Sequence, residues 1–189
     1  AANKRQANIS IVGVPKTIDN DLGFVEKTFG FETSVQVASE IITSAHCEAE
    51  GAENGIGIVK LMGRDSGFIT ATASLANSVV DFCLIPETPF RFNGPNGICA
   101  AIHRRIEQNK HAVIVVAESA GQDLFENSKK TIDASGNVLK DDIGELMKQE
   151  ITAYFKQINT PVSIKYLDPS YHIRSVSANA ADAVFCHLL

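Results

Sequence analysis

Two aspartates separated by a single residue stand near the start of the chain. Asp19 and Asp21 lie in the run GVPKTIDND, directly after an apolar alternation at 9–14 that predicts a strand. In extended backbone, side chains two residues apart leave the same face, so we expect at least one carboxylate to have a perturbed pKa. Such a pair can form a general base or a metal site. Spacing alone equally permits an Asx-type turn with two capping carboxylates.

A second candidate site stands in the run KLMGRDSGF. Gly63 follows a predicted strand at 56–62 and precedes a predicted helix near 67–77. Glycine lets the backbone approach a ligand, and the free amides at the start of a helix attract anions. A phosphate paired with Arg64 would therefore suit this turn. The alternative is a tight surface turn in which Arg64 pairs with Asp65.

Two common nucleotide-binding motifs are absent from the sequence. No GxxxxGK followed by Ser or Thr occurs, and the run GIGIVK has Lys60 where the dinucleotide motif needs its third glycine. The run around Asp19 is not a calcium loop either, because its twelfth position is Gly30 instead of a glutamate.

Composition and charge narrow the class of partner. The chain has 189 residues and a net charge of −5, with no basic block, which argues against a nucleic-acid partner. Its longest apolar run, at 112–117, is far shorter than the roughly 20 residues that span a bilayer, so no membrane segment is predicted. We expect a small-molecule partner.

The cysteines and the N-terminal residues favour a cytoplasmic protein. The first ten residues are not followed by an apolar stretch of signal-peptide length. The cysteines show no CxxC spacing, so we expect buried thiols in a reducing compartment. They are Cys47, Cys83, Cys99 and Cys186.

Short apolar runs alternate with helical patterns along the chain. This order predicts an α/β fold: one doubly wound, mostly parallel sheet with helices on both faces. Two capping boxes, Thr33 with Gln36 and Asp142 with Glu145, predict helix starts. The predicted strands are 9–14, 56–62, 82–85, 112–117 and 162–166; the predicted helices are 35–45, 67–77, 96–109, 142–155 and 178–188. The segments 86–97 and 119–140 fit neither pattern, and the second is either a functional loop or a family insertion.

Ligands of open parallel sheets bind beyond the carboxyl ends of the strands. The residues that follow each predicted strand are therefore the first to inspect, and they include cations, carboxylates and hydroxyls. They are Lys16, Thr17, Asp19, Asp21, Met62, Gly63, Arg64, Pro86, Glu87, Glu118, Gln122, Asp168, Tyr171 and Arg174.

Five motifs in order resemble one family. GVPKTIDND, KLMGRDSGF, IPETPF, VAESAGQD and KYLDPSYHIRS closely resemble the 6-phosphofructokinases, in the branch shared by pyrophosphate-dependent enzymes and ATP-using relatives. The resemblance covers nearly the entire chain. It implies a phosphofructokinase-like fold and phosphoryl transfer from a donor to the 1-hydroxyl of fructose 6-phosphate, with Mg²⁺, giving fructose 1,6-bisphosphate in glycolysis.

The resemblance also assigns expected roles at the first motif. Asp19 would take the proton of the hydroxyl, and Thr17 would help hold the transferring phosphoryl group. Asp21 would help organise the Mg²⁺, and Lys16 would lie at the donor phosphates. Arg64 is expected to act both in catalysis and in substrate binding.

Further residues are expected to bind the sugar phosphate. Glu118 would bind sugar hydroxyls, Arg174 would be the main cation for the 6-phosphate, and Lys165 would serve a neighbouring subunit. The full expected substrate set is Thr17, Ile18, Asp19, Met62, Gly63, Arg64, Glu118, Tyr171, His172, Ile173 and Arg174.

The resemblance implies that residues 1–189 form a single substrate-binding lobe, incomplete at both ends. Residues 1–21 would be the catalytic strand and loop of a neighbouring donor-binding lobe, whose glycine-rich GGDG segment has no match here. The isolated chain is then expected to be inactive, and the full-length protein to be a homo-oligomer. ATP is the preferred donor. The alternatives are a pyrophosphate-dependent phosphofructokinase and a non-catalytic paralogue that only binds sugar phosphate.

Overall fold

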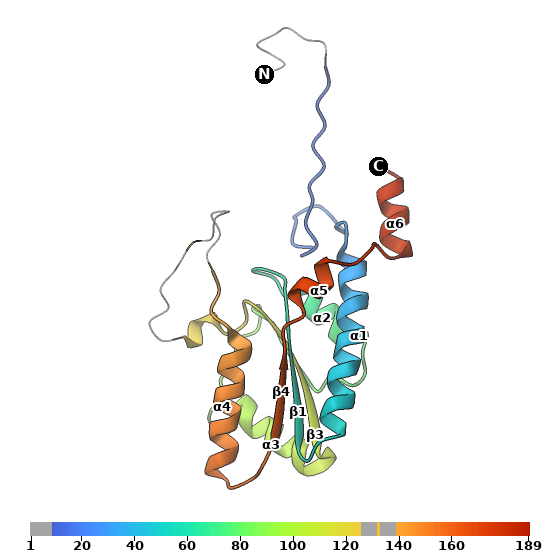
Figure 1. Ribbon diagram of the computed structural model, residues 1–189. Helices are drawn as coiled ribbons and strands as arrows, with labels where there is room; N and C mark the ends of the chain where they lie inside the picture. Colours follow the sequence, from blue (N-terminus) through green and yellow to red (C-terminus); the bar gives the residue numbers. More distant parts are fainter. Residues whose placement is uncertain (1–8, 126–131, 133–138) are drawn as a thin grey trace.

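A four-stranded parallel sheet forms the centre of the protein, as seen in a computed structural model that describes residues 9–125, 132 and 139–189 (Figure 1). The strand order is β2-β3-β1-β4. Within β3, residues 112–117 are fully buried, as expected for the apolar run of a parallel strand covered on both faces. The strands are β1 (Gly55–Leu61), β2 (Phe82–Leu84), β3 (His111–Ala117) and β4 (Ser163–Leu167).

Helices cover both faces of the sheet, so the predicted fold class is confirmed. On one face, α1 and α2 pack over Val59, Val113 and Val115. On the other, α3 and α4 pack over Ile56 and Ile114 (Figure 1). The helices are α1 (Phe31–Glu50), α2 (Phe68–Leu75), α3 (Ile98–Asn109), the 3₁₀ turn η2 (Gln122–Leu124), α4 (Ile143–Gln157), α5 (Ser170–Arg174) and α6 (Ala180–His187). Among the described residues, each helix is too short or too polar to cross a bilayer.

The predicted strand at 9–14 is wrong. This segment runs away from the sheet as an extended trace (Figure 1), and Ile11 and Val12 are 80% and 84% exposed. A strand needs a neighbour for its backbone hydrogen bonds, and the sheet within the described residues is complete without this segment. The apolar alternation is present in the sequence, but the segment pairs with no strand in the part of the chain that the structure describes.

Three smaller expectations also need correction. The helix α1 begins after Gly30, whose φ of 87° lies in the left-handed region, so the predicted capping box at Thr33 is wrong. Residues 171–174 belong to the short helix α5 instead of a strand end. Of the four cysteines, Cys99 is buried and the other three are exposed. The second capping box is half confirmed, because Asp142 accepts hydrogen bonds from the amides of Gly144 and Glu145.

The N-terminus of α1 is capped by a residue of α6. The buried Asp182 carboxylate accepts hydrogen bonds from the amides of Gly30 and Thr33, at 3.0 and 2.8 Å, and from the Thr33 hydroxyl at 2.6 Å. Phe29 and Phe185 stack beside it, with ring centroids 4.4 Å apart. A carboxylate at the N-terminus of a helix also interacts favourably with the positive end of the helix dipole. These contacts hold α6 and the preceding α5 region against α1.

We predict that Asp182→Ala loosens the first turn of α1. Three buried donors lose their acceptor, which costs about 3 kcal/mol, or roughly a hundredfold in the local opening equilibrium. Amide hydrogen exchange at Gly30 and Thr33 should accelerate by about that factor. The matched control is Asp123→Ala, an exposed aspartate of η2. Unchanged protection of these amides would show that Asp182 does not hold the helix start.

Candidate functional site

A cavity of about 460 Å³ opens at the carboxyl edge of the sheet. The parallel register ends β1 at Leu61 opposite Ala117 of β3, so the residues that follow both strands meet there. Charged residues dominate its wall. The lining residues are Asp19, Lys60, Met62, Arg64, Glu118, Leu139, Lys140, Asp141, Asp142, Ser170 and Arg174.

Asp19 is the half-buried carboxylate of this wall. Its Oδ2 accepts a hydrogen bond of 3.1 Å from the Thr17 hydroxyl, which in turn accepts the Asp19 amide at 3.1 Å. Burial raises the pKa of the Asp19 carboxyl above its ordinary value, and the charge of Asp21 adds to this; the Thr17 hydrogen bond and the charges of Arg64 and Lys16 act in the opposite direction. The expected perturbation is present, with burial as its largest cause.

Asp21 does not lie on the same face as Asp19, in contrast to the prediction from their spacing. Asn20 has a φ of 58°, so the backbone turns between the two aspartates and the expected extended arrangement is wrong. The Asn20 side chain fixes this turn by accepting the Thr28 amide at 2.9 Å. Asp21 is exposed and does not line the cavity.

The turn after β1 is held by Glu118. Gly63 has a φ of 154°, and a Cβ there would meet the Ser66 carbonyl oxygen at 2.6 Å, so glycine is required. Arg64 follows with a φ of 53°. The Glu118 Oε1 accepts hydrogen bonds from the Gly63 and Arg64 amides, at 3.2 and 2.6 Å. A carboxylate from β3 thus fixes the unusual backbone that presents Arg64 to the cavity.

Asp65 has an ion-pair partner from a distant segment. It pairs with Lys140, which lies on the far wall of the cavity. The turn at Arg64 is therefore bound on two sides, by Glu118 from β3 and by Lys140 from the stretch before α4.

The four expected residues of α5 occupy different environments. Arg174 lines the cavity, and its guanidinium carbon lies 4.6 Å from the centre of the Tyr171 ring. Tyr171 itself is 78% exposed. Ile173 is buried in the core with α1, and His172 is exposed outside the cavity. One turn of helix spreads these side chains around its axis, so they cannot all face one ligand.

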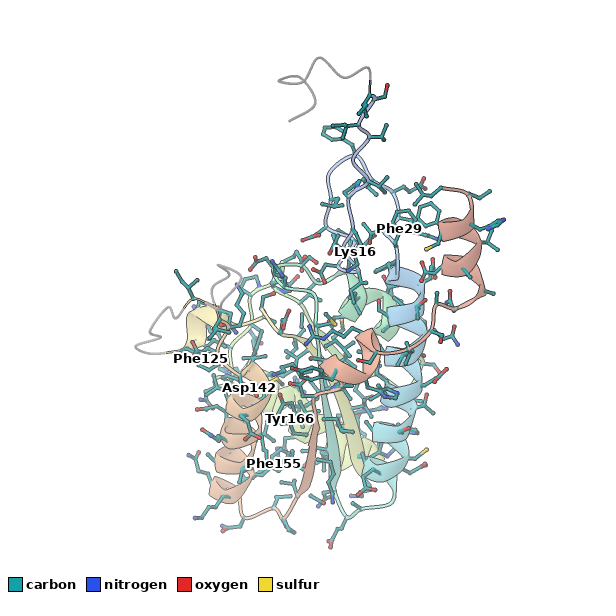
Figure 2. The ribbon with its side chains drawn as sticks, turned by 45° about the horizontal axis from the view of Figure 1, so that its top comes forward. Lys16, Phe29, Phe125, Asp142, Phe155 and Tyr166 are labelled. Atoms are coloured by element: carbon teal, nitrogen blue, oxygen red, sulfur yellow. The ribbon has the colours of Figure 1, made fainter. Side chains whose placement is uncertain are left out.

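A second cavity, of about 470 Å³, lies on the other side of Asp19. Lys16, Thr17 and Ile18 line it, together with four residues of the first cavity, Asp19, Met62, Arg64 and Arg174. In Figure 2, Lys16 stands at the base of the N-terminal segment, beyond the ends of the strands. Asp19 therefore lies on the wall between the two cavities.

Lys165 lies away from both cavities. Its side chain, on β4, points toward α1 and forms an ion pair of 3.2 Å with Glu48. Neither cavity includes it among its lining residues.

Sequence reasoning missed several wall residues, chiefly Lys60 and the stretch 139–142. In the sequence, Lys60 stands out only because it occupies the third glycine position of the dinucleotide motif. A lysine inside an apolar buried strand was the signal that could have identified it, because such a charge needs partners. Asp142 was recognised only as a helix cap. Figure 2 shows Asp142 next to Tyr166, whose hydroxyl donates to it at 2.7 Å.

Curated proteins similar to this chain share one name. ATP-dependent 6-phosphofructokinase 5, chloroplastic, of Arabidopsis thaliana is 52% identical over 186 residues, which are 98% of this chain and 34% of that protein. ATP-dependent 6-phosphofructokinase of Borreliella burgdorferi is 51% identical, over 97% of this chain and 42% of that protein. The chain thus spans between about a third and two fifths of these relatives.

Solved structures share the fold at low identity. A pyrophosphate-dependent phosphofructokinase from Nitrosospira multiformis superimposes with a TM-score of 0.72 at 18% identity, over 99% of this chain and 44% of that one. Its counterpart from Marinobacter aquaeolei gives 0.69 at 21% identity, over 98% of this chain and 44% of that one. The family model described as Phosphofructokinase matches residues 1–189. This chain therefore belongs to the phosphofructokinase family.

Proposed function

We propose that the complete protein transfers a phosphoryl group from ATP to the 1-hydroxyl of fructose 6-phosphate. The observation that carries this proposal is one cavity wall on which the half-buried Asp19 stands with two arginines, Arg64 and Arg174. Phosphoryl transfer needs an oriented hydroxyl, a base and cations near the phosphates, and little covalent chemistry from the protein. The names of the relatives at about 50% identity support the same reaction.

Asp19 is the proposed general base. A general base must be basic enough to accept a proton, and the raised pKa of the Asp19 carboxyl increases its basicity. The Thr17 hydroxyl, bonded to this carboxylate, would orient it and contact the transferring phosphoryl group. Arg64 would stabilise the charge on that group as it moves.

Arg174 is the proposed main cation for the 6-phosphate. Its stacking on Tyr171 restrains the guanidinium, which reduces the entropy lost when it binds a phosphate. Met62 and Gly63 would form the wall beside the sugar, and Glu118 would accept hydrogen bonds from sugar hydroxyls. We assign Ile18, His172 and Ile173 to the surroundings of this site, since each lies next to a residue with a direct role.

A Mg²⁺ ion held mainly by phosphates and water would need few ligands from this chain. Among the described residues, no group of three or more His, Cys, Asp or Glu could hold a metal ion. Mg²⁺ commonly uses only one or two carboxylates and completes its octahedron with phosphates and water. Asp21 is the proposed protein ligand, and Lys16 would contact the donor phosphates. When bound, Mg²⁺ would neutralise charge on the transferring group.

Oligomer formation, location and lobe structure remain part of this proposal. We propose a homo-oligomer in which Lys165 contributes to a neighbouring subunit's site, in a cytoplasmic protein that uses neither nucleic acid nor a membrane. Residues 1–189 would be its sugar phosphate lobe, with 1–21 contributed by the donor-binding lobe. The structural similarity to pyrophosphate-dependent enzymes supports the fold. Because the sequence identity is low, it gives no support to pyrophosphate as donor.

Replacement of the proposed base tests the mechanism. In the complete protein, we expect Asp19→Asn to lower kcat by at least about a hundredfold, the contribution typical of a general base, with KM for fructose 6-phosphate changed little. Steady-state kinetics measure both values. The control is Asp123→Asn, which removes an exposed carboxylate outside both cavities. A kcat within tenfold of the parent would exclude the base role.

The pH dependence should respond to Thr17. Protonated Asp19 cannot accept the hydroxyl proton, so kcat/KM should fall as pH falls through the pKa of this carboxyl. The Thr17 hydroxyl lowers that pKa, so Thr17→Val should raise it and move the acid limb to higher pH. The matched control is Thr152→Val, at an exposed position of α4, which should leave the limb in place. A limb that moves to lower pH would contradict the assignment.

The donor is tested by direct comparison. We expect turnover of fructose 6-phosphate when the complete protein receives ATP and Mg²⁺, and none when it receives pyrophosphate and Mg²⁺. Product formation is measured as fructose 1,6-bisphosphate. Activity with pyrophosphate alone would overturn the choice of ATP.

A further inference from the structure

Lys60 is a largely buried cation in the wall of the cavity. It interrupts the apolar strand β1, and its side chain is only 13% exposed. Its Nζ lies 3.2 Å from Asp142 Oδ1 and 3.0 Å from Asp168 Oδ2. A buried lysine is costly unless it is paired, so these two carboxylates are what permits a charge at this position.

The charge on Lys60 is maintained by its surroundings. Burial pulls the pKa of Lys60 down, but interactions with Tyr166 and Asp168 outweigh burial and raise it above the ordinary value. Burial likewise acts to raise the pKa of Asp142 and of Asp168, while hydrogen bonds, from Tyr166 and Ser170 respectively, and Lys60 lower both. All three groups are therefore charged near neutral pH.

Asp142 lines the cavity, whereas Asp168 is hydrogen-bonded to Ser170, which lines it. Asp142 caps α4 through the Gly144 amide, at 3.0 Å, and ends the stretch 139–142 that lines the cavity. Asp168 follows β4 and accepts both the amide and the hydroxyl of Ser170, at 3.2 and 2.5 Å. Ser170 is the first residue of α5, the helix that ends with Arg174.

Lys60 also balances the charge of the cavity. The wall carries equal numbers of cations and carboxylates, so the loss of one cation would leave an excess of negative charge facing a phosphate. At a few ångströms this repulsion is substantial even at the effective dielectric of a protein surface. The cations are Lys60, Arg64, Lys140 and Arg174, and the carboxylates are Asp19, Glu118, Asp141 and Asp142.

We propose that Lys60 is a positioning residue for the sugar phosphate. It pairs with Asp142 and Asp168 at the starts of α4 and α5, and it neutralises carboxylates that would otherwise repel the phosphate. The proposal rests on the proposed function for its substrate. Lys60 acts through its carboxylate partners, so its loss is compensated when one of these loses its charge.

A double-mutant cycle tests this proposal in the complete protein. We expect Lys60→Met to raise KM for fructose 6-phosphate about tenfold, the scale of one unneutralised charge near a phosphate, with kcat changed less than about threefold. Asp168→Asn alone should stay within about threefold of the parent in KM. The double variant Lys60→Met/Asp168→Asn should return KM to within about threefold of the parent, because it restores the charge balance.

The matched control is Lys148→Met. It makes the same substitution at a lysine of α4 that pairs with Glu145 and lies outside the cavity, and it should leave KM unchanged. A Lys60→Met protein with unchanged KM would overturn the proposal. A double variant as impaired as Lys60→Met would also overturn it, since neutralisation of the carboxylates predicts recovery.

Two further outcomes remain informative. If Lys60→Met does not fold, the double variant decides alone, and a KM tenfold above the parent would overturn the proposal. If the parent does not phosphorylate fructose 6-phosphate, the proposed function fails, and Lys60 is tested with inorganic phosphate by titration calorimetry. Weaker phosphate binding by Lys60→Met than by Lys148→Met would support the role, while equal binding by the two variants, or no binding by the parent, would overturn it.

Discussion

The parallel pairing of β1 with β3 and β4 brings together the turns of the candidate site that follow these strands. Because the three strands run in the same direction, the residues after Leu61, Ala117 and Leu167 emerge at one edge of the sheet. The strands keep this register because both faces of the sheet are apolar and covered by helices. A shift of one residue would turn these buried side chains to the opposite face and separate the turn of Arg64 from Glu118.

Two charged side chains that enter this apolar framework are paired there. Lys60, near the carboxyl end of β1, has two carboxylate partners, and Asp182, buried beside α1, has three donors. In both cases one ionised side chain joins elements that are far apart in the sequence. The same contacts that make these charges tolerable also fix the orientation of α4, α5 and α6 around the sheet.

The sequence allowed the fold class, four strands and most helices to be predicted, because buried parallel strands and amphipathic helices carry local periodic signals. It did not allow the capping of α1 to be predicted, since Asp182 lies 149 residues from Thr33. The motifs identified Asp19, Arg64, Glu118 and Arg174, which do line the cavity. They did not show that Asn20 turns the chain away before Asp21, because a positive φ at asparagine leaves no clear pattern in one sequence.

Glu118 accepts the Gly63 and Arg64 amides through the same oxygen, Oε1. One end of the carboxylate thus supports the protein's own backbone, and the other oxygen can meet a ligand. A ligand bound to that second oxygen would therefore contact the same side chain that restrains the turn at Gly63 and Arg64. Replacement of Glu118 would therefore remove a ligand contact and also release the backbone that positions Arg64. A single substitution at Glu118 measures the sum of these two effects on ligand affinity.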